Sequence, residues 1–303
     1  MSDLAKMIGS EDETPQDLEK MIPLLPSPMV QLIGKQASAR PNVDNIVCFC
    51  RLAASDLNRP QNGRALHHRC VLIMNLKTAA TVCVDDRNIP LNPGEALLVF
   101  PFQFHDYSAP ESEDLLWFFV TFDIEDVSDL ERFRYSPFVL SPNLERLAHD
   151  LIQAYLLPGN DDLSVAVFRL MLERIRLVEP IVRTEGTQPA PSTLLSRVNQ
   201  MALSSREMPS AKEMAATVGI SESHLRARFR ESCGISLGRH LRQLRLEKAC
   251  GMLRLGTSRI SEIAENCGFT SVYTFSRAFA HAYGMSPSEY RRIGNPPTPS
   301  TDS

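Results

Sequence analysis

The 303-residue sequence lacks the short motifs that identify the common enzyme classes. No SxxK, GxSxG, P-loop or dinucleotide-binding fingerprint is present, and no two carboxylates stand out as an acid/base couple. The seven cysteines form no CxxC pair and no His/Cys spacing typical of a metal site. We therefore expect no enzymatic activity, no cofactor, no metal and no disulfide framework.

Long apolar runs are also missing. No stretch approaches the roughly 20 apolar residues that a helix needs to cross a bilayer, and the acidic N-terminus has no apolar signal-peptide core. We expect neither export nor membrane insertion. An odd number of cysteines without a disulfide pattern fits a reducing compartment, so we predict a cytoplasmic protein.

Positive charge is concentrated in the C-terminal third. Residues 192–294 carry 15 Lys and Arg against 8 Asp and Glu, a net charge of +7, whereas the remainder carries 17 against 28, a net charge of -11. A local basic surface is typical of proteins that bind a polyanion, and a solvated charged face is the alternative when charge is considered alone.

The same third contains one pattern twice. EMAATVGISESHLRARFRESCGIS covers residues 213–236, and EIAENCGFTSVYTFSRAFAHAYGMS covers residues 262–286. The two copies are offset by 49 residues at their first glycines and by 50 at their last phenylalanines. Each copy predicts a short apolar helix, a turn with glycine, a hydroxyl N-cap and a second helix with surface arginine. This order is typical of a helix-turn-helix DNA-binding unit.

The first copy predicts a recognition helix after Gly219, where a positive φ costs little. Ser210 and Glu213 form a capping box for the preceding helix, and Ser221 caps the recognition helix. Leu225 and Phe229, four residues apart, are expected to point inward. The residues then expected to face the DNA are Ser223, Arg226, Ala227 and Arg230.

The second copy repeats the arrangement, with Thr270 as the predicted cap and Phe275 and Phe279 as the buried pair. The residues expected on its outer face are Tyr273, Ser276, Arg277 and Ala280. An arginine there can contact guanine O6 and N7 together, which gives roughly 1 to 3 kcal/mol of discrimination. Taken singly, each outer arginine is also consistent with an ordinary solvated side chain.

A continuous helix is predicted between the copies, in LGRHLRQLRLEKACGMLRLG. About 18 residues would span about 27 Å, close to the ~34 Å between successive major grooves on one side of DNA. Arg239 and Arg242 are expected at phosphates, and Arg245 either contacts phosphate or braces the two units. Ser286, Pro287 and Glu289 predict a last short helix.

The N-terminal half has a different pattern, with five short apolar or alternating runs separated by turn residues. They predict strands of an antiparallel sandwich or small barrel at 45–54, 69–76, 81–86, 95–100 and 115–124. Helical spacing follows at 143–157 and 163–181. The apolar stripe of the second of these helices packs either on its own β domain or on a second copy in a dimer.

Residues 192–293 resemble the DNA-binding domain of the AraC/XylS family of bacterial transcription regulators. The resemblance rests on the two copies, on RLEKA at 245–249 and on GMSPSEYR at 284–291. It implies seven helices, two helix-turn-helix units and an asymmetric DNA site of roughly two turns. The family usually has arginine where this chain has Ala227, so we assign base reading in the first copy to Arg226.

The segment LNPGEALLVFPFQFHDY, residues 91–107, resembles the cupin-like effector domain that precedes the DNA-binding domain in many members of that family. The resemblance implies a barrel that binds a small molecule. Candidate effector contacts are Arg51, His68, His105 and Trp117, of which Trp117 either stacks on a ligand or is a buried structural residue. Metal binding through His67, His68 and His105 is disfavoured because the HxH spacing of metal cupins is absent and adjacent histidines on a strand face opposite sides.

These observations predict an α+β protein: a cupin-like β-barrel with trailing helices, then an all-α domain with two helix-turn-helix units joined by a long helix. The predicted segments are a flexible acidic region 1–40, an effector and dimerisation domain 41–183, a linker 184–191, the DNA-binding domain 192–293 and a disordered tail 294–303.

The function predicted is sequence-specific transcription regulation on double-stranded DNA, controlled by a small effector, with a sugar as one candidate. A homodimer is expected, and RNA polymerase is a further candidate partner. Two alternatives stay open at this point. One is a cupin metalloenzyme fused to a DNA-binding module, and the other is a regulator switched by a partner protein through the helices between 144 and 180.

Overall fold

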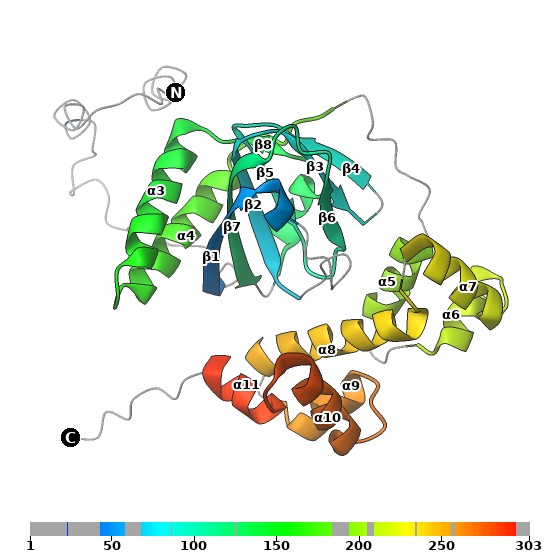
Figure 1. The fold of residues 1–303 in the computed structure, drawn as a ribbon. Helices are drawn as coiled ribbons and strands as arrows, with labels where there is room; N and C mark the ends of the chain where they lie inside the picture. Colours follow the sequence, from blue (N-terminus) through cyan, green and yellow to red (C-terminus); the bar gives the residue numbers. More distant parts are fainter. Residues whose placement is uncertain are drawn as a thin grey trace, which may run out of the picture. The chain divides into compact units, whose positions relative to one another are not determined.

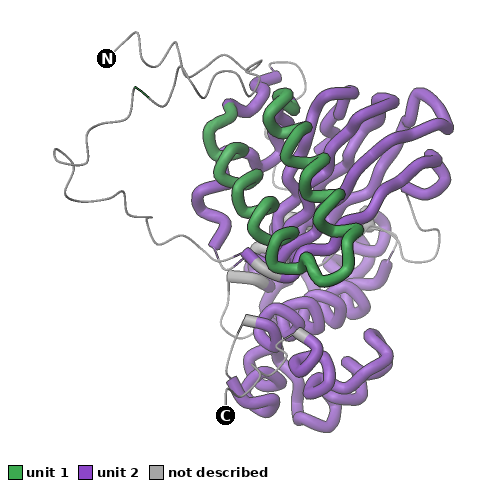
Figure 2. The backbone as a smooth tube through the Cα atoms, turned by 90° about the vertical axis from the view of Figure 1, so that its left-hand side faces the viewer, with its two compact units in different colours: residues 1–42, 140–178 green, residues 43–139, 179–303 purple. Residues whose placement is uncertain are grey.

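A computed structural model describes residues 23, 43–57, 68–85, 87–124, 126–183, 194–204, 209–233, 235–255 and 258–294. The chain divides into two units, residues 1–42 with 140–178 and residues 43–139 with 179–303, coloured green and purple in Figure 2. The predicted flexible region 1–40, linker 184–191 and tail from residue 295 lie outside the described residues, apart from Pro23.

Eight antiparallel strands form two sheets, called the barrel below (Figure 1). The larger sheet has the strand order β1-β7-β2-β5-β8 and the smaller one β4-β3-β6. The strands are β1 Val43–Ala53, β2 Cys70–Lys77, β3 Ala80–Val84, β4 Arg87–Leu91, β5 Glu95–Val99, β6 His105–Ser108, β7 Asp114–Ile124 and β8 Phe138–Val139. The five predicted strands are present, and β4, β6 and β8 were not predicted.

Strand β7 explains why this segment reads as one continuous apolar run. Leu115, Trp117 and Phe119 contribute to the interior cluster of the barrel, and the alternate residues Val120 and Phe122 are buried on the opposite face. A strand that is buried on both faces over most of its length carries a near-continuous run of apolar residues. Two short 3-10 helices, Ala54–Asp56 and Ser128–Phe133, lie in the connections.

Helices α3, Pro142–Leu156, and α4, Asp161–Ile175, pack against each other in the first unit. Ser141 caps α3 by accepting a hydrogen bond from the Leu144 N–H at 3.4 Å. The predicted stripe on α4 is divided: Met171 and Ile175 are buried, whereas Leu163 and Leu170 are half exposed. Part of the stripe is therefore accessible.

Seven helices make up the described part of the C-terminal region, as the family resemblance implied. They are α5 Leu194–Ser204, α6 Ala211–Val218, α7 Glu222–Cys233, α8 Leu237–Leu255, α9 Ile260–Asn266, α10 Val272–Tyr283 and α11 Pro287–Gly294. The predicted fold class, a β-rich N-terminal region with trailing helices followed by a helical region, is confirmed.

Helix α8 belongs to two separate apolar cores. Its first half contributes Leu237, Leu241 and Leu244 to a core around Leu225 and Phe229. Its second half contributes a further set, Leu246, Ala249, Cys250 and Leu253, to a core around Phe275 and Phe279. The two helix-turn-helix units are therefore joined by one helix of 19 residues.

Candidate nucleic-acid interface

The first helix-turn-helix unit begins with the capping box that the sequence predicts. The Ser210 Oγ accepts a hydrogen bond from the Glu213 N–H at 3.2 Å, and the Glu213 carboxylate accepts one from the Ser210 N–H at 2.7 Å. These bonds hold the pKa of Glu213 below its usual range. Helix α6 then ends at Gly219, which has φ +78°, and Ser221 accepts from the His224 N–H at 3.2 Å to start α7.

Helix α7 presents the predicted reading face to solvent. Leu225 and Phe229 are fully buried, whereas the four residues proposed to face DNA, Ser223, Arg226, Ala227 and Arg230, are all exposed. The Arg226 guanidinium pairs with Glu222 one turn earlier, with Nη2 and Oε1 2.6 Å apart. This exposed pair is weak, so the arginine can exchange its partner for a base at little cost.

The second unit corrects one prediction. Ser271, not Thr270, is the N-cap of α10: its Oγ accepts from the Thr274 N–H at 3.1 Å, and the Thr274 Oγ1 accepts from the Ser271 N–H at 3.2 Å. The reason is the one-residue change in offset between the copies. The extra residue lies between Gly268 and the recognition helix, which moves the cap one position further along the chain.

The outer face of α10 is otherwise arranged as predicted. Phe275 and Phe279 are fully buried, and Tyr273 is 73% exposed. Arg277 and Ala280 are exposed, and Ser276 is half buried. At the end of this unit, Ser286 and Glu289 exchange the predicted capping bonds at 3.2 and 2.8 Å to start α11.

The arginines of α8 differ in their surroundings. Arg239 and Arg242 are exposed, as expected of phosphate contacts, whereas Arg245 is half buried. Burial, and then the charge of Arg242, lower the pKa of Arg245. Arg245 was predicted either to contact phosphate or to hold the two helix-turn-helix units together. Its half-buried position favours the second role.

Three of the four candidate effector residues meet at the aromatic cluster of the barrel, which consists of Phe49, Tyr107, Trp117 and Phe119. Trp117 is fully buried and donates its indole N–H to the Thr78 carbonyl at 3.1 Å. Arg51 is paired in register with Trp117 and lies over the Phe49 ring, 5.1 Å from its centroid. The buried His105 ring contacts Tyr107 edge-on at 6.2 Å.

His68 lies elsewhere. It occupies the bend before β2, not a strand as the sequence predicted, and its Nδ1 lies 2.8 Å from the Glu247 carboxylate of α8. The structure therefore does not bring His68 to Arg51, His105 and Trp117. His67 lies outside the described residues. Within the part of the chain that the structure describes, no three His, Cys, Asp or Glu side chains gather as a metal-binding group.

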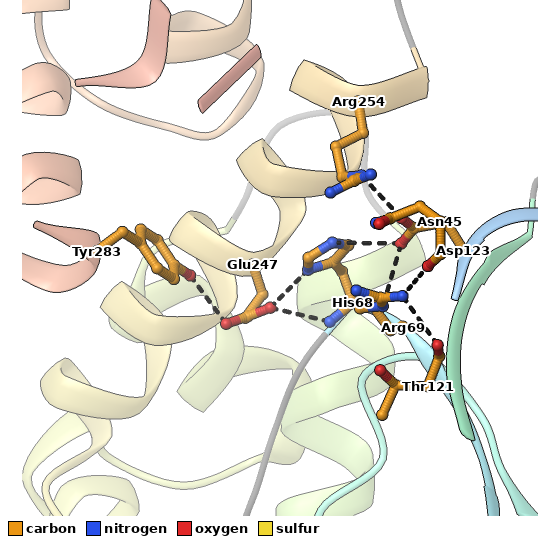
Figure 3. Close-up of polar contacts among 8 residues, drawn as sticks. All are labelled: Asn45, His68, Arg69, Thr121, Asp123, Glu247, Arg254 and Tyr283. Atoms are coloured by element: carbon orange, nitrogen blue, oxygen red, sulfur yellow. Dashed lines mark hydrogen bonds and ion pairs between the residues drawn. The ribbon is translucent and has the colours of Figure 1, made fainter. Parts of the chain in front are cut away.

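Sequence reasoning missed the polar cluster that surrounds His68 (Figure 3). Its members come from the barrel and from the C-terminal helices: Asn45, His68, Arg69, Thr121, Asp123, Glu247, Arg254 and Tyr283. The buried Asp123 carboxylate accepts from Asn45 Nδ2 at 2.6 Å and lies 2.7 Å from Arg254 Nε. One signal was available, because Glu247 is the only acidic residue of α8 and follows the buried Leu244 by one turn.

Two exposed recognition helices joined by one helix, together with a β-barrel, define a DNA-binding regulator with a ligand-binding domain. Comparison with known proteins agrees. A model described as an AraC-like ligand binding domain matches residues 52–172, and a helix-turn-helix domain model matches residues 214–293. The chain belongs to the AraC/XylS family of transcription regulators. Among the described residues, no helix has both the length and the apolar character needed to cross a bilayer.

Two relatives illustrate the similarity of the DNA-binding region. The HTH-type transcriptional activator RhaR of Pectobacterium carotovorum is 47% identical over 72 residues, which are 24% of this chain and 25% of RhaR. The xylose operon regulatory protein of Escherichia coli K12 is 38% identical over 78 residues, 26% of this chain and 20% of that protein. These matches span a quarter or less of each relative.

A match over more of the chain is found among solved structures. Vibrio cholerae ToxT, solved with a bound unsaturated fatty acid, covers 86% of this chain and 98% of its own, with 13% identity and a TM-score of 0.41.

Proposed function

We propose that this protein is a cytoplasmic, sequence-specific transcription activator that reads two neighbouring major-groove segments of one DNA site. The observation that carries the proposal is the pair of outer faces on α7 and α10, held by the same 19-residue helix. At 1.5 Å per residue this helix is about 28 Å long, near the ~34 Å repeat of the major groove. One chain can thus supply both recognition helices for one DNA site. The name of RhaR supports activation.

Arg226 and Arg277 carry base recognition in this proposal. Both project from exposed positions on helices whose inner faces are locked by buried pairs, Leu225 with Phe229 and Phe275 with Phe279. Ser221, Ser223, Thr270 and Ser276 lie beside them at or near the helix N-termini and supply hydroxyls for phosphate or base contacts. Arg230 and Tyr273 complete the two surfaces.

Selection of bound sequences from random duplexes by the full-length protein tests this function. We expect a motif with two short elements about 10 base pairs apart, because successive major grooves recur at that interval. Full-length protein that binds the selected duplex no better than scrambled competitor at the same salt concentration would contradict the proposal.

We infer that the effector is a small molecule bound at the aromatic cluster, with sugars as the first class to test. Arg51 supplies hydrogen-bond donors over the ring face of Phe49 and is paired in register with Trp117, a combination that suits polar molecules with a flat apolar face. The name of the xylose operon regulatory protein supports a sugar. Because Trp117 is the only tryptophan in the chain, its fluorescence reports on this cluster alone. Titration with monosaccharides, xylose included, should change that fluorescence, and Arg51→Ala should abolish the change.

We further propose a homodimer through α3 and α4. The exposed apolar residues on these helices and at the end of α3 are Ile152, Tyr155, Leu156, Leu157, Leu163 and Leu170. Leu163 and Leu170 are seven residues apart, so they lie on one side of α4, as in a helix pair that packs through a seam. Light scattering after size-exclusion chromatography measures the mass. Leu163→Glu with Leu170→Glu should convert a dimer to a monomer, and an unchanged mass would place the interface elsewhere. RNA polymerase then remains the partner through which activation would act.

A further inference from the structure

The barrel supplies two aromatic side chains, the buried Phe104 and the half-buried Phe102, to the core of the first helix-turn-helix unit. Phe104, immediately before β6, is 3% exposed and belongs to the same apolar core as Val198, Leu225 and Leu237. The centroid of its ring lies 4.8 Å from that of the His240 ring of α8, and the His240 ring also stacks on Phe229 of α7 with centroids 4.9 Å apart. His240 is therefore in ring contact both with the barrel and with the first recognition helix.

The loop that carries Phe104 is held from several directions. The Asp85 carboxylate accepts hydrogen bonds from the Phe104 N–H at 3.1 Å, from Gln103 Nε2 at 3.0 Å and from the Tyr135 hydroxyl at 2.7 Å. The next residue, His105, contacts the aromatic cluster through Tyr107. Because Phe104 is fixed in this way, a change inside the barrel moves it as part of a rigid loop.

A second connection joins the barrel to the second helix-turn-helix unit (Figure 3). The Glu247 carboxylate accepts from the His68 N–H at 2.9 Å, lies 2.8 Å from the His68 Nδ1, and accepts from the Tyr283 hydroxyl at 2.8 Å. Tyr283 is the last residue of α10. Glu247 is therefore placed between the barrel and the second recognition helix, as His240 is for the first.

The face of α8 around Glu247 carries two further neighbours of the barrel. Gly251 lies one turn further on, and a Cβ on it would be 4.0 Å from the His68 Cδ2, an ordinary van der Waals contact. Arg254, seven residues after Glu247, lies 2.7 Å from the Asp123 carboxylate of β7. Burial alone would raise the pKa of Glu247, but the hydrogen bond and charge of His68 outweigh it, so the pKa is held below its usual value.

These contacts leave the recognition surfaces uncovered. Arg226 and Arg230 on α7, and Tyr273 and Arg277 on α10, remain exposed while the barrel contacts α8. The barrel therefore does not cover the residues proposed to contact DNA. The barrel contacts the inner side of each helix-turn-helix unit. From there it can set the positions of α7 and α10 without blocking their outer faces.

We propose that the barrel positions the two recognition helices through separate contacts, with Phe104 acting on α7 through His240 and His68 acting on α10 through Glu247. This inference rests on the proposed DNA-reading role of α7 and α10. Phe104 and His68 are positioning residues, since neither touches the proposed DNA surface. An effector that shifts the Phe104 loop would thus act first on one half of the DNA site.

The test uses full-length protein and the selected duplex, with each half-site scrambled in turn. Arg226→Ala and Arg277→Ala identify the half-site of each helix, because the effect of each vanishes when its own half-site is scrambled. Phe104→Leu should weaken binding about 3- to 10-fold, within the range for side chains that carry coupling, and only while the α7 half-site is intact. His68→Ala should do the same for the α10 half-site.

Three further variants separate positioning from loss of folding. Phe104→Met keeps most of the side-chain volume and should give the same half-site pattern if Phe104→Leu fails to fold. His68→Gln retains a side-chain donor toward Glu247 and should restore binding at the α10 half-site. Phe138→Leu removes a buried barrel ring that packs on Phe133, and it should affect neither half-site selectively.

The outcomes are distinguishable. If the parent protein has no sequence preference, the proposed function fails and this inference fails with it. If the arginine variants behave as expected but Phe104→Leu and His68→Ala weaken both half-sites alike, or neither, the positioning inference alone is wrong. Half-site selectivity is the decisive reading, because general destabilisation lowers binding at both.

Discussion

The His240 imidazole of α8 donates its Nε2 hydrogen to the Oδ1 of Asn199 on α5, 2.7 Å away, and both side chains are buried. Among the described residues, the opposite nitrogen, Nδ1, has no hydrogen-bond partner. Burial lowers the pKa of His240 to about 3, because protonation would place a charge away from water in the apolar core.

The free energy of unfolding of the first helix-turn-helix unit should therefore fall in mild acid. In the unfolded chain His240 titrates near its ordinary pKa of about 6.5, so the unfolded state binds the extra proton below that pH. Stability from the neutral imidazole is complete above pH 6.5 and falls toward pH 3 by up to about 1.4 kcal/mol per pH unit. Urea unfolding measures the free energy of unfolding at pH 7.5 and at pH 5.5. The loss between the two pH values should be about 1 kcal/mol smaller in His240→Gln than in the parent. The exposed His224→Gln should leave the difference unchanged.

Arg277→Ala should weaken binding to the selected duplex by roughly 1 to 3 kcal/mol and relax base preference at one position of the α10 half-site. Binding measured at fixed salt on a series of single-base variants checks this. Arg292→Ala provides the control, because Arg292 is exposed on α11 outside both outer faces. Equal base preferences in Arg277→Ala and the parent would remove Arg277 from the recognition surface.

Arg226→Ala should produce the corresponding loss at the α7 half-site, whereas Arg228→Ala should not change base preference. Both arginines are exposed on α7, two residues apart, but Arg226 shares the outer face with Ser223 and Arg230. Glu222→Gln removes the carboxylate that pairs with Arg226 and repels phosphate, so binding should strengthen at low salt. If Arg228→Ala instead changes base preference, our assignment of the α7 reading face is wrong.

Phe275→Ala should destabilise the second helix-turn-helix unit by about 3 to 5 kcal/mol, since a fully buried ring leaves a cavity when it is truncated. Tyr273→Ala, two residues earlier and 73% exposed, should change stability by about 0.5 kcal/mol or less. Denaturant unfolding followed by circular dichroism measures both. Similar losses in the two variants would contradict the inward and outward assignment on α10.

The helix-turn-helix units could be predicted because their signals are local. Hydroxyl caps, Gly219 and the buried pairs lie within a few residues of one another, so spacing alone placed them. The one error, Thr270 for Ser271, arose where two adjacent hydroxyls compete and the second copy gains a residue. In the barrel, β4 and β6 escaped prediction because they are only five and four residues long and mix polar with apolar side chains.

The contacts of His68 could not be predicted from the sequence. His68 and Glu247 are 179 residues apart, and neither lies in a recognisable motif. A histidine at the edge of a strand is consistent with many environments, and the sequence pattern placed His68 inside the barrel. Likewise, Phe104 reads as an ordinary barrel core residue, although its ring completes a core built from helices of the other half of the chain.

The two junctions on α8 bear on how such proteins can be recombined. A hybrid regulator that takes its N-terminal half from another protein would leave His240 without Phe104 and Glu247 without His68. A working hybrid would need the β5–β6 loop, the bend before β2 and the matching face of α8 to be transplanted as a set.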